Sequence, residues 1–259
     1  MLLGVNIDHI AVLREARKIN DPNPLDALGI CKLANADQIT IHLREDRRHI
    51  HDDDAKKIIE NSSLPVNLEC SINDEIIDIV CKLKPQRATL VPENRAEVTT
   101  EGGLDVKSNF EKIKKAIKKL HDNEIEVSLF IDPKKETIKL SSELKVEWIE
   151  LHTGTFANIY AMLHGNLRNT HHSIKELELP RQELKVMLKE SKKQIKKASN
   201  KADQLNLKVA AGHGLNYQNV SLISSIKTIS ELNIGQSIIA RSVYTGLYQA
   251  ILDMKESIK

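Results

Sequence analysis

The chain has 259 residues, of which 41% are hydrophobic and 29% are charged, so it can form a sizeable folded core. Aromatic residues make up only 3%, which leaves few side chains for stacking on nucleic-acid bases. The chain has 38 Lys and Arg against 36 Asp and Glu, and the resulting net charge of +2 provides no overall attraction to a polyanion. Composition therefore argues against a nucleic-acid-binding protein or a membrane-surface protein.

The N-terminal residues carry no basic region and reach an acidic residue at Asp8, unlike a secretory signal peptide. No apolar run approaches the roughly 18 residues that a membrane span needs. The cysteines Cys31, Cys70 and Cys81 form no CxxC pair, so they predict neither a disulfide framework nor a cysteine-rich zinc site. We therefore expect a soluble cytoplasmic protein that has reduced thiols and does not contact a membrane.

Short runs rich in Val, Ile and Leu alternate with stretches of helical periodicity along the chain. Strands are predicted at residues 2–7, 38–43, 65–70, 87–91, 125–131, 147–151, 207–211 and 229–234. Helices are predicted at about 24–34, 52–61, 73–83, 108–121, 134–142, 182–205, 216–225 and 237–257. The strands are continuously apolar, which is typical of parallel strands covered on both faces.

Eight strand–helix units in alternation predict an α/β protein, a (β/α)₈ TIM barrel that forms one domain over residues 1–259. An open doubly wound sheet is the alternative, because periodicity does not reveal whether a sheet closes. Neither a Gly-x-Gly-x-x-Gly after the first strand nor a Walker-type Gly-Lys-Ser/Thr is present, so the common nucleotide-binding motifs are absent.

Two of the predicted units are longer than the others. A polar loop at 92–105 follows the fourth strand, and its length and its Gly102-Gly103 pair lead us to expect closure over bound substrate. An extra helical insertion at about 156–180 precedes the long helix. Five lysines stand four residues apart on that helix: Lys185, Lys189, Lys193, Lys197 and Lys201. The row indicates a solvated face, and a surface that binds RNA or an acidic partner is the alternative.

Catalytic groups of such barrels lie at the C-terminal strand ends and in the loops that follow. Four of the ten histidines fall at predicted strand ends: His9, His42, His152 and His213. Glu69 ends the third strand and is its only acid, and a carboxylate that loses hydration there acquires a raised pKa suited to a general base. Together with His42 and His213, Glu69 predicts a site for several successive proton transfers.

A metal site is an alternative interpretation, since His and Glu also bind metals. It is disfavoured because no His-x-His ends the first strand and no carboxylate ends the eighth. We therefore predict no metal.

Two regions of the sequence are suited to binding anions. The segments 212–214 and 234–237 follow the seventh and eighth strands, where barrel loops and helix N-termini bind phosphate. A second, cationic cluster follows the first two strands and contains Arg14, Arg17, Arg44, Arg47, Arg48 and His49. Two separate sites predict two phosphorylated substrates or one bisphosphate. A phosphosugar isomerase or aldolase is the alternative enzyme, although no lysine ends a strand to form a Schiff base.

Four segments closely resemble the pyridoxine 5′-phosphate synthase family: GVNIDHIA at 4–11, HLREDRRHI at 42–50, EVTTEGGLDV at 97–106 and AGHGL at 211–215. The resemblance implies a barrel enzyme without a metal or an organic cofactor. It also implies that 1-deoxy-D-xylulose 5-phosphate condenses with 3-amino-2-oxopropyl phosphate to pyridoxine 5′-phosphate, with release of phosphate and water. A homo-octamer built from dimers is a further implication.

The resemblance also implies roles for individual residues. His42 and Glu69 would accept protons and His213 would donate one. The residues that would hold the amino-ketone phosphate are Asn6, Arg17, Gly214, Gly235 and Gln236. Those that would hold the deoxyxylulose phosphate are Asp8, His9, Arg44, His49 and Thr99. The family commonly has histidine at the position of Gln236, so a contact made by that side chain would change, whereas a backbone N–H contact would not.

Overall fold

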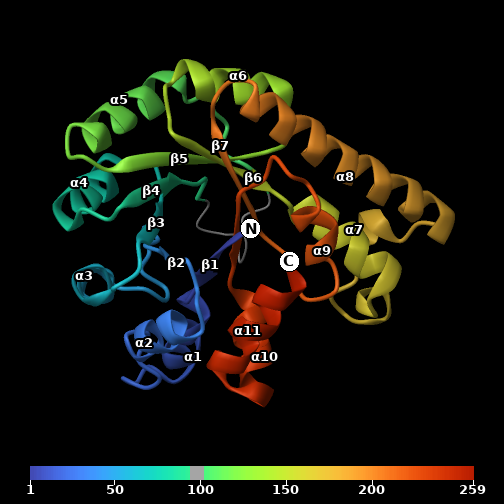
Figure 1. Ribbon diagram of the computed structural model, residues 1–259, viewed down its shortest axis with the longest axis horizontal. Coiled ribbons are helices and arrows are strands. Elements are labelled where there is room, and N and C mark those ends of the chain that lie inside the picture. The colour runs from blue at the N-terminus through green and yellow to red at the C-terminus, as the bar shows by residue number, and fades with distance from the viewer. Residues whose placement is uncertain (94–101) are drawn as a thin grey trace.

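The computed structural model describes residues 1–93 and 102–259 (Figure 1). Within them, eight parallel strands close into a barrel in sequence order. They are β1 (Leu2–Asn6), β2 (Gln38–His42), β3 (Val66–Cys70), β4 (Arg87–Leu90), β5 (Glu126–Ile131), β6 (Trp148–His152), β7 (Lys208–Gly212) and β8 (Glu231–Ile234). β8 pairs with β1, so the predicted closed barrel is confirmed and the open sheet is excluded. Every strand end lies within two residues of its predicted position.

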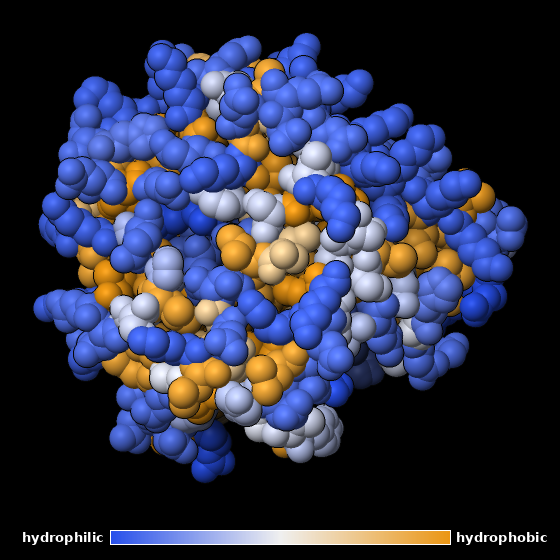
Figure 2. Space-filling view, in the orientation of Figure 1, coloured by the Kyte–Doolittle hydropathy of each residue, from blue (hydrophilic) through white to orange (hydrophobic). Residues whose placement is uncertain are grey.

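Helices surround the strands (Figure 1). Those that were predicted are α2 (Asp26–Leu33), α3 (Asp52–Asn61), α4 (Asp74–Leu83), α5 (Phe110–His121), α6 (Lys135–Glu143), α8 (Arg181–Asp203) and α9 (Val220–Ser224). The prediction of α9 was too long, because residues 216–219 form a turn. Hydrophilic side chains cover the outer helices and apolar ones show between them (Figure 2).

The helix predictions were wrong in three places. The sequence patterns missed α1 (Asp8–Arg17), which follows β1 almost directly and exposes Val12 and Leu13, so it lacks a clear polar face. They also missed α7 (Gly154–His164), which follows β6 in the same way. The single helix predicted at 237–257 is two helices, α10 (Gln236–Thr245) and α11 (Leu247–Ser257). Gly246 separates them with φ of 77°, a backbone conformation that favours glycine.

The predicted helical insertion is built from α7 and two short 3₁₀ turns, Leu167–Asn169 and Lys175–Leu177. It has a small core of its own, formed by Ile159, Met162, Leu163 and Leu184. The next helix, α8, buries an inward row that includes Ile195 and Ala198, as its sequence pattern predicted. Four lysines of the predicted row on α8 are exposed, and Lys201 is half-buried.

The interior of the barrel contains a buried ion pair. Arg87 on β4 donates to Glu231 on β8 over 2.7 and 3.3 Å, and both residues are buried. The Arg87 guanidinium also lies 3.8 Å above the centre of the Trp148 ring. Gln38 on β2 donates to the same Glu231 carboxylate over 3.2 Å. These contacts connect strands across the barrel, in addition to the hydrogen bonds between neighbouring strands.

None of the helices in the described part of the chain is both long and apolar enough to cross a bilayer.

We expect Glu231→Ala to lower the free energy of unfolding by about 3–5 kcal/mol, because it leaves the buried Arg87 charge without its partner. The double variant Arg87→Met with Glu231→Leu should lose less, since it removes both charges and keeps side-chain volume. Urea denaturation followed by circular dichroism measures both values. Glu60→Ala, on the exposed face of α3, is the matched control. Equal midpoints for Glu231→Ala and this control would contradict the role of the pair.

Candidate active site

A cavity of about 640 Å³ lies at the C-terminal ends of the strands. Eight of the residues predicted from the sequence line it: Asn6, His9, His42, Glu69, His213, Gly214, Gly235 and Gln236. They come from the ends of β1, β2, β3, β7 and β8 or from the residues that follow these strands. The closed barrel therefore brings all three predicted catalytic residues to one cavity.

Three further predicted residues lie behind the cavity wall. Asp8 accepts hydrogen bonds from the backbone N–H of His42 and from the Asn6 side chain, each over 2.9 Å. The His49 ring centre lies 6.2 Å from that of His42, and burial lowers the pKa of His49. Arg44 is buried, with Nε 3.6 Å from an Asp46 oxygen.

The structure does not place the remaining two predicted residues at the cavity, and only one of them belongs to its described part. Arg17 is exposed in the last turn of α1 and is not among the residues that line the cavity. Thr99 lies in residues 94–101, outside the described residues, as does most of the loop that we expected to close over substrate. The roles assigned to Arg17, Thr99 and this loop remain predictions.

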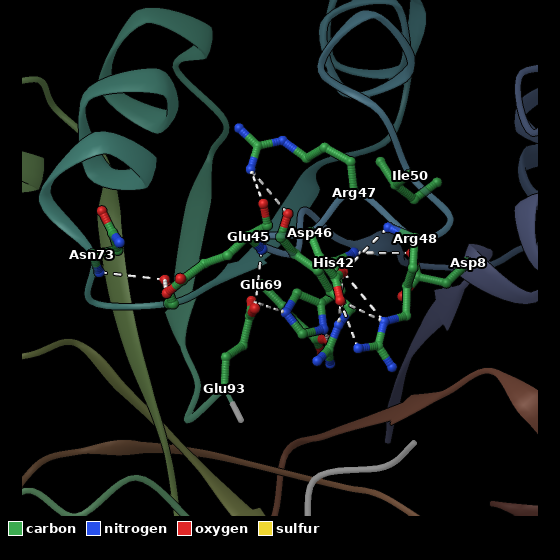
Figure 3. A network of polar contacts seen from close by, with 12 residues as sticks. Asp8, His42, Glu45, Asp46, Arg47, Arg48, Ile50, Glu69, Asn73 and Glu93 are labelled. Carbon is green, nitrogen blue, oxygen red and sulfur yellow. Dashed lines mark hydrogen bonds and ion pairs between the residues drawn. The ribbon is translucent and has the colours of Figure 1, made fainter. Parts of the chain in front are cut away.

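His42 and Glu69 occupy matching positions on the paired strands β2 and β3 (Figure 3). His42 Nε2 lies 2.8 Å from Glu93 Oε1, and His42 Nδ1 lies 4.0 Å from Glu69 Oε2. Burial opposes ionisation of Glu93, but hydrogen bonds from His42 and from the Glu45 backbone N–H outweigh it and lower the Glu93 pKa. Glu93 is then a carboxylate that accepts a hydrogen bond from Nε2–H, which leaves a lone pair on Nδ1 facing Glu69. Sequence reasoning missed Glu93, because it lies in a loop.

Two carboxyl groups in the cavity have raised pKa values. Burial raises the pKa of Glu69 well above its usual range, and the negative charges of Glu150 and Asp8 add to the effect. Burial also raises the pKa of Glu150 to about 7, with a contribution from Glu231, although a hydrogen bond from Asn233 opposes the rise. Glu150 therefore exchanges protons more readily near neutral pH than an exposed glutamate does, and the pKa of Glu69 is shifted in the same direction. Glu150 lies two residues before His152, which ends β6, and this nearness to the strand end could have identified it from the sequence.

His213 is a neutral imidazole in this cavity. Burial and, to a smaller extent, the neighbouring His152 together lower its pKa to about 4. Its backbone is held at φ of 81°, and the Thr153 hydroxyl donates to the carbonyls of Gly212 and His213, each over 2.7 Å. His213 can thus protonate a substrate only if a bound negative charge raises its pKa.

Close backbone packing shapes the predicted phosphate site. A Cβ atom at Gly235 would lie 2.8 Å from Asn6 Cβ and 2.9 Å from the Asn6 carbonyl oxygen, so a larger residue would displace Asn6. Gly214 has φ of 81°, and a Cβ there would lie 2.6 Å from Ala157 Cβ. Gln236 begins α10 directly after Gly235, and the N-terminus of this helix borders the cavity. Helix N-termini bind anions through free backbone N–H groups.

Within the described ranges, no group of three or more His, Cys, Asp or Glu side chains is arranged to hold a metal ion.

The chain is similar to the proteins of one family over nearly its whole length. The family model described as "Pyridoxal phosphate biosynthesis protein PdxJ" matches residues 3–259. A curated relative from Aliarcobacter butzleri is 80% identical over 259 residues, covering 100% of this chain and 99% of the relative. A relative from a Sulfurovum species is 68% identical over 255 residues, covering 98% of this chain and 99% of the relative. Both are named pyridoxine 5′-phosphate synthase.

Among solved structures, N-(5′-phosphoribosyl)anthranilate isomerase from Pyrococcus furiosus is similar, with a TM-score of 0.56 and 14% identity. The match covers 100% of this chain and 98% of that one. At this identity the likeness shows the barrel fold alone.

We expect Glu150→Gln to stabilise the protein at pH 8 and to leave stability unchanged below pH 4.5. An acid whose folded pKa is raised from 4.5 to about 7 opposes folding only where the unfolded chain is ionised, so its cost grows from pH 4.5 to 7. The full gain at pH 8 is roughly 3 kcal/mol, because each pKa unit corresponds to about 1.4 kcal/mol. Glutamine also keeps an oxygen that accepts from Asn233.

Urea denaturation at pH 4, 6 and 8 measures this difference, with Glu60→Gln as the exposed control. If the Glu150→Gln variant has the same free energy of unfolding as the wild type at every pH, ionisation of Glu150 does not destabilise the folded protein.

Proposed function

We propose that this chain, which belongs to the pyridoxal phosphate biosynthesis protein PdxJ family, is a pyridoxine 5′-phosphate synthase that works by general acid–base catalysis. It condenses 1-deoxy-D-xylulose 5-phosphate with 3-amino-2-oxopropyl phosphate, closes the pyridine ring, and releases one phosphate and two waters. The observation that carries the mechanism is the convergence of His42, Glu69, Glu150 and His213 on one cavity. Incubating the purified protein with both substrates and detecting pyridoxine 5′-phosphate tests the activity.

The reaction needs several proton transfers in one enclosed space. The amine of one substrate attacks a ketone of the other, phosphate is eliminated, a carbon–carbon bond closes the ring, and two dehydrations complete the aromatic system. Each of these steps adds or removes a proton, and one positioned group contributes about 10²–10⁴-fold to a step. Several acid–base groups around one cavity support such a sequence.

His42 and Glu69 are the proposed proton acceptors. Glu93 orients the His42 ring so that the Nδ1 lone pair faces the Glu69 carboxyl, 4.0 Å away. A raised pKa makes the carboxylate of Glu69 a stronger base than an exposed glutamate. Adjacent positions on β2 and β3 let the two groups act on neighbouring substrate atoms.

His213 is the proposed proton donor. Its pKa of about 4 describes the cavity without substrate. A phosphate bound next to it, at Gly214 and Gly235, would place negative charge close to the imidazole and raise that pKa. His213 would then gain the proton that it donates only when substrate is present.

The two phosphates are proposed to bind on opposite sides of these groups. Asn6, Gly214, Gly235 and the backbone of Gln236 would hold the amino-ketone phosphate at the N-terminus of α10. His9, which lines the cavity, would hold the deoxyxylulose phosphate with Asp8, Arg44 and His49 behind it. Two fixed phosphate sites would align the reacting atoms between them.

We also propose that residues 1–259 act as one barrel domain and that the protein is a homo-oligomer, an octamer by family resemblance. Exposed apolar side chains on α1 and on the packed helices α10 and α11 support association: Val12, Leu13, Val243, Tyr244 and Tyr248. Analytical ultracentrifugation tests the subunit number.

Glu69→Gln should lower kcat by about 10²–10⁴-fold and leave the affinity for phosphorylated substrates nearly intact, because it keeps the shape of the side chain and removes the base. Steady-state kinetics measure the loss, and calorimetric titration with each substrate measures affinity. Glu60→Gln on α3 is the matched surface control. A Glu69→Gln enzyme with near-normal turnover would refute the assignment.

Gln236→Ala should leave KM for the amino-ketone phosphate within about threefold of wild type, because we assign that contact to the backbone N–H. Gly235→Ala should raise KM by about tenfold or more, since its Cβ would push against Asn6. The same kinetic assay compares the two neighbouring variants. A large effect of Gln236→Ala alone would assign the contact to the side chain.

A further inference from the structure

His152, at the end of β6, has a ring nitrogen that the chemistry above does not use. The residue is only 5% exposed and lines the cavity. Its Nδ1 lies 3.3 Å from Asp132 Oδ1, whereas its buried Nε2 has no hydrogen-bond partner among the described residues. Buried polar atoms in proteins are nearly always satisfied. An unsatisfied nitrogen in a cavity wall therefore indicates an atom that a ligand completes.

Asp132 determines which nitrogen of His152 carries the proton. Its Oδ1 also accepts from the backbone N–H of Gly103 over 3.0 Å, and its Oδ2 lies 3.0 Å from Lys134 Nζ. Hydrogen bonds from His152, Lys134 and Gly103 hold the pKa of Asp132 well below its usual range. A carboxylate only accepts, so the proton of a neutral His152 is on Nδ1 and a lone pair is on Nε2.

The packing around His152 keeps this nitrogen in place. Phe130 and His213 hold the ring, with centre-to-centre distances of 5.2 and 5.0 Å. A Cβ atom at Gly154 would lie 2.4 Å from His152 Nε2 and 3.0 Å from His213 Cδ2. A side chain at position 154 would therefore clash with Nε2, whereas glycine leaves room for the ring beside His213.

We propose that His152 is a further substrate-contacting residue, whose Nε2 accepts a hydrogen bond from an amino or hydroxyl group of bound substrate, and that Asp132 is a positioning residue that keeps Nε2 unprotonated. The inference rests on the proposed function and adds to it a residue that none of the steps above employs. Both substrates offer donors of this class: one carries an amine and the other carries hydroxyl groups. The acceptor lies beside His213, so it would orient the group near the proposed proton donor.

Two substitutions of His152 test the roles of its two ring nitrogens separately. Asparagine places an amide N–H near the position of Nδ1, which keeps the bond to Asp132 and removes Nε2. Glutamine places an amide near the position of Nε2. We expect His152→Asn to lower kcat/KM by about 10²-fold and His152→Gln to lower it by about tenfold. Equal kcat/KM for His152→Asn and wild type would overturn the proposal.

Two substitutions of Asp132 test its positioning role. Asp132→Asn keeps an oxygen that accepts from Nδ1–H, and the exposed Lys134 can turn away from the new amide. Asp132→Ala removes the acceptor. We expect kcat/KM within about threefold of wild type for the first and about tenfold lower for the second. Nitrogen-15 NMR of His152 should report the Nδ1–H tautomer in wild type and a mixture in Asp132→Ala; an unchanged tautomer would overturn the role of Asp132.

The experiment distinguishes this inference from the proposed function. Wild-type protein that forms no pyridoxine 5′-phosphate would refute the function, whereas an active wild type with an equally active His152→Asn would refute only the role of His152. If thermal denaturation shows that the His152→Asn variant is not folded, NMR of the wild-type protein decides instead. Adding each substrate alone should shift the His152 Nε2 resonance for at least one of them. The absence of a shift with both substrates at saturation would overturn the proposal.

Discussion

The buried ion pair of Arg87 and Glu231 sets the electrostatics of the barrel interior. The Glu231 carboxylate accepts hydrogen bonds from Arg87 and Gln38. The Asn233 amide donates both to Glu231 and to Glu150 at the cavity, and its distance to Glu150 is 2.7 Å. Two strand glycines make room for this polar chain: a Cβ at Gly4 would lie 2.0 Å from Asn233, and one at Gly212 would lie 2.2 Å from Glu150. Hydrogen bonds between polar side chains thus connect the cavity end of the barrel to its opposite end.

Burial makes three titratable groups that line the cavity favour their neutral forms. Burial raises the pKa values of Glu69 and Glu150 and lowers that of His213. The same low polarity that disfavours charge on each group strengthens its interaction with any charge that a substrate introduces. A phosphate bound in the cavity would therefore raise the pKa of His213, which could then carry the proton that it donates, and would raise the pKa values of Glu69 and Glu150 further.

The sequence allowed the barrel to be predicted because every strand is a short apolar run that the closed sheet buries. The meeting of Glu69 and His213 in one cavity could be predicted because both stand at or next to strand ends, where parallel topology brings them together. Glu93 could not, since a glutamate after Pro92 looks like any loop residue until β4 places it against His42. The Asp132–His152 pair also depends on closure, because it joins the ends of two different strands. Helix α1 was missed because its apolar side chains Val12 and Leu13 face outward.

Helix α7 serves two unrelated purposes along its length. Its first residues, Gly154 and Thr155, border the cavity, whereas Ile159, Met162 and Leu163 belong to the small core shared with Leu184 of α8. The first part of the helix therefore shapes the cavity, whereas the later part packs in the small core. The turns between α7 and α8 pack against this second core. We therefore expect changes in the length of these turns to leave the barrel and its cavity unchanged.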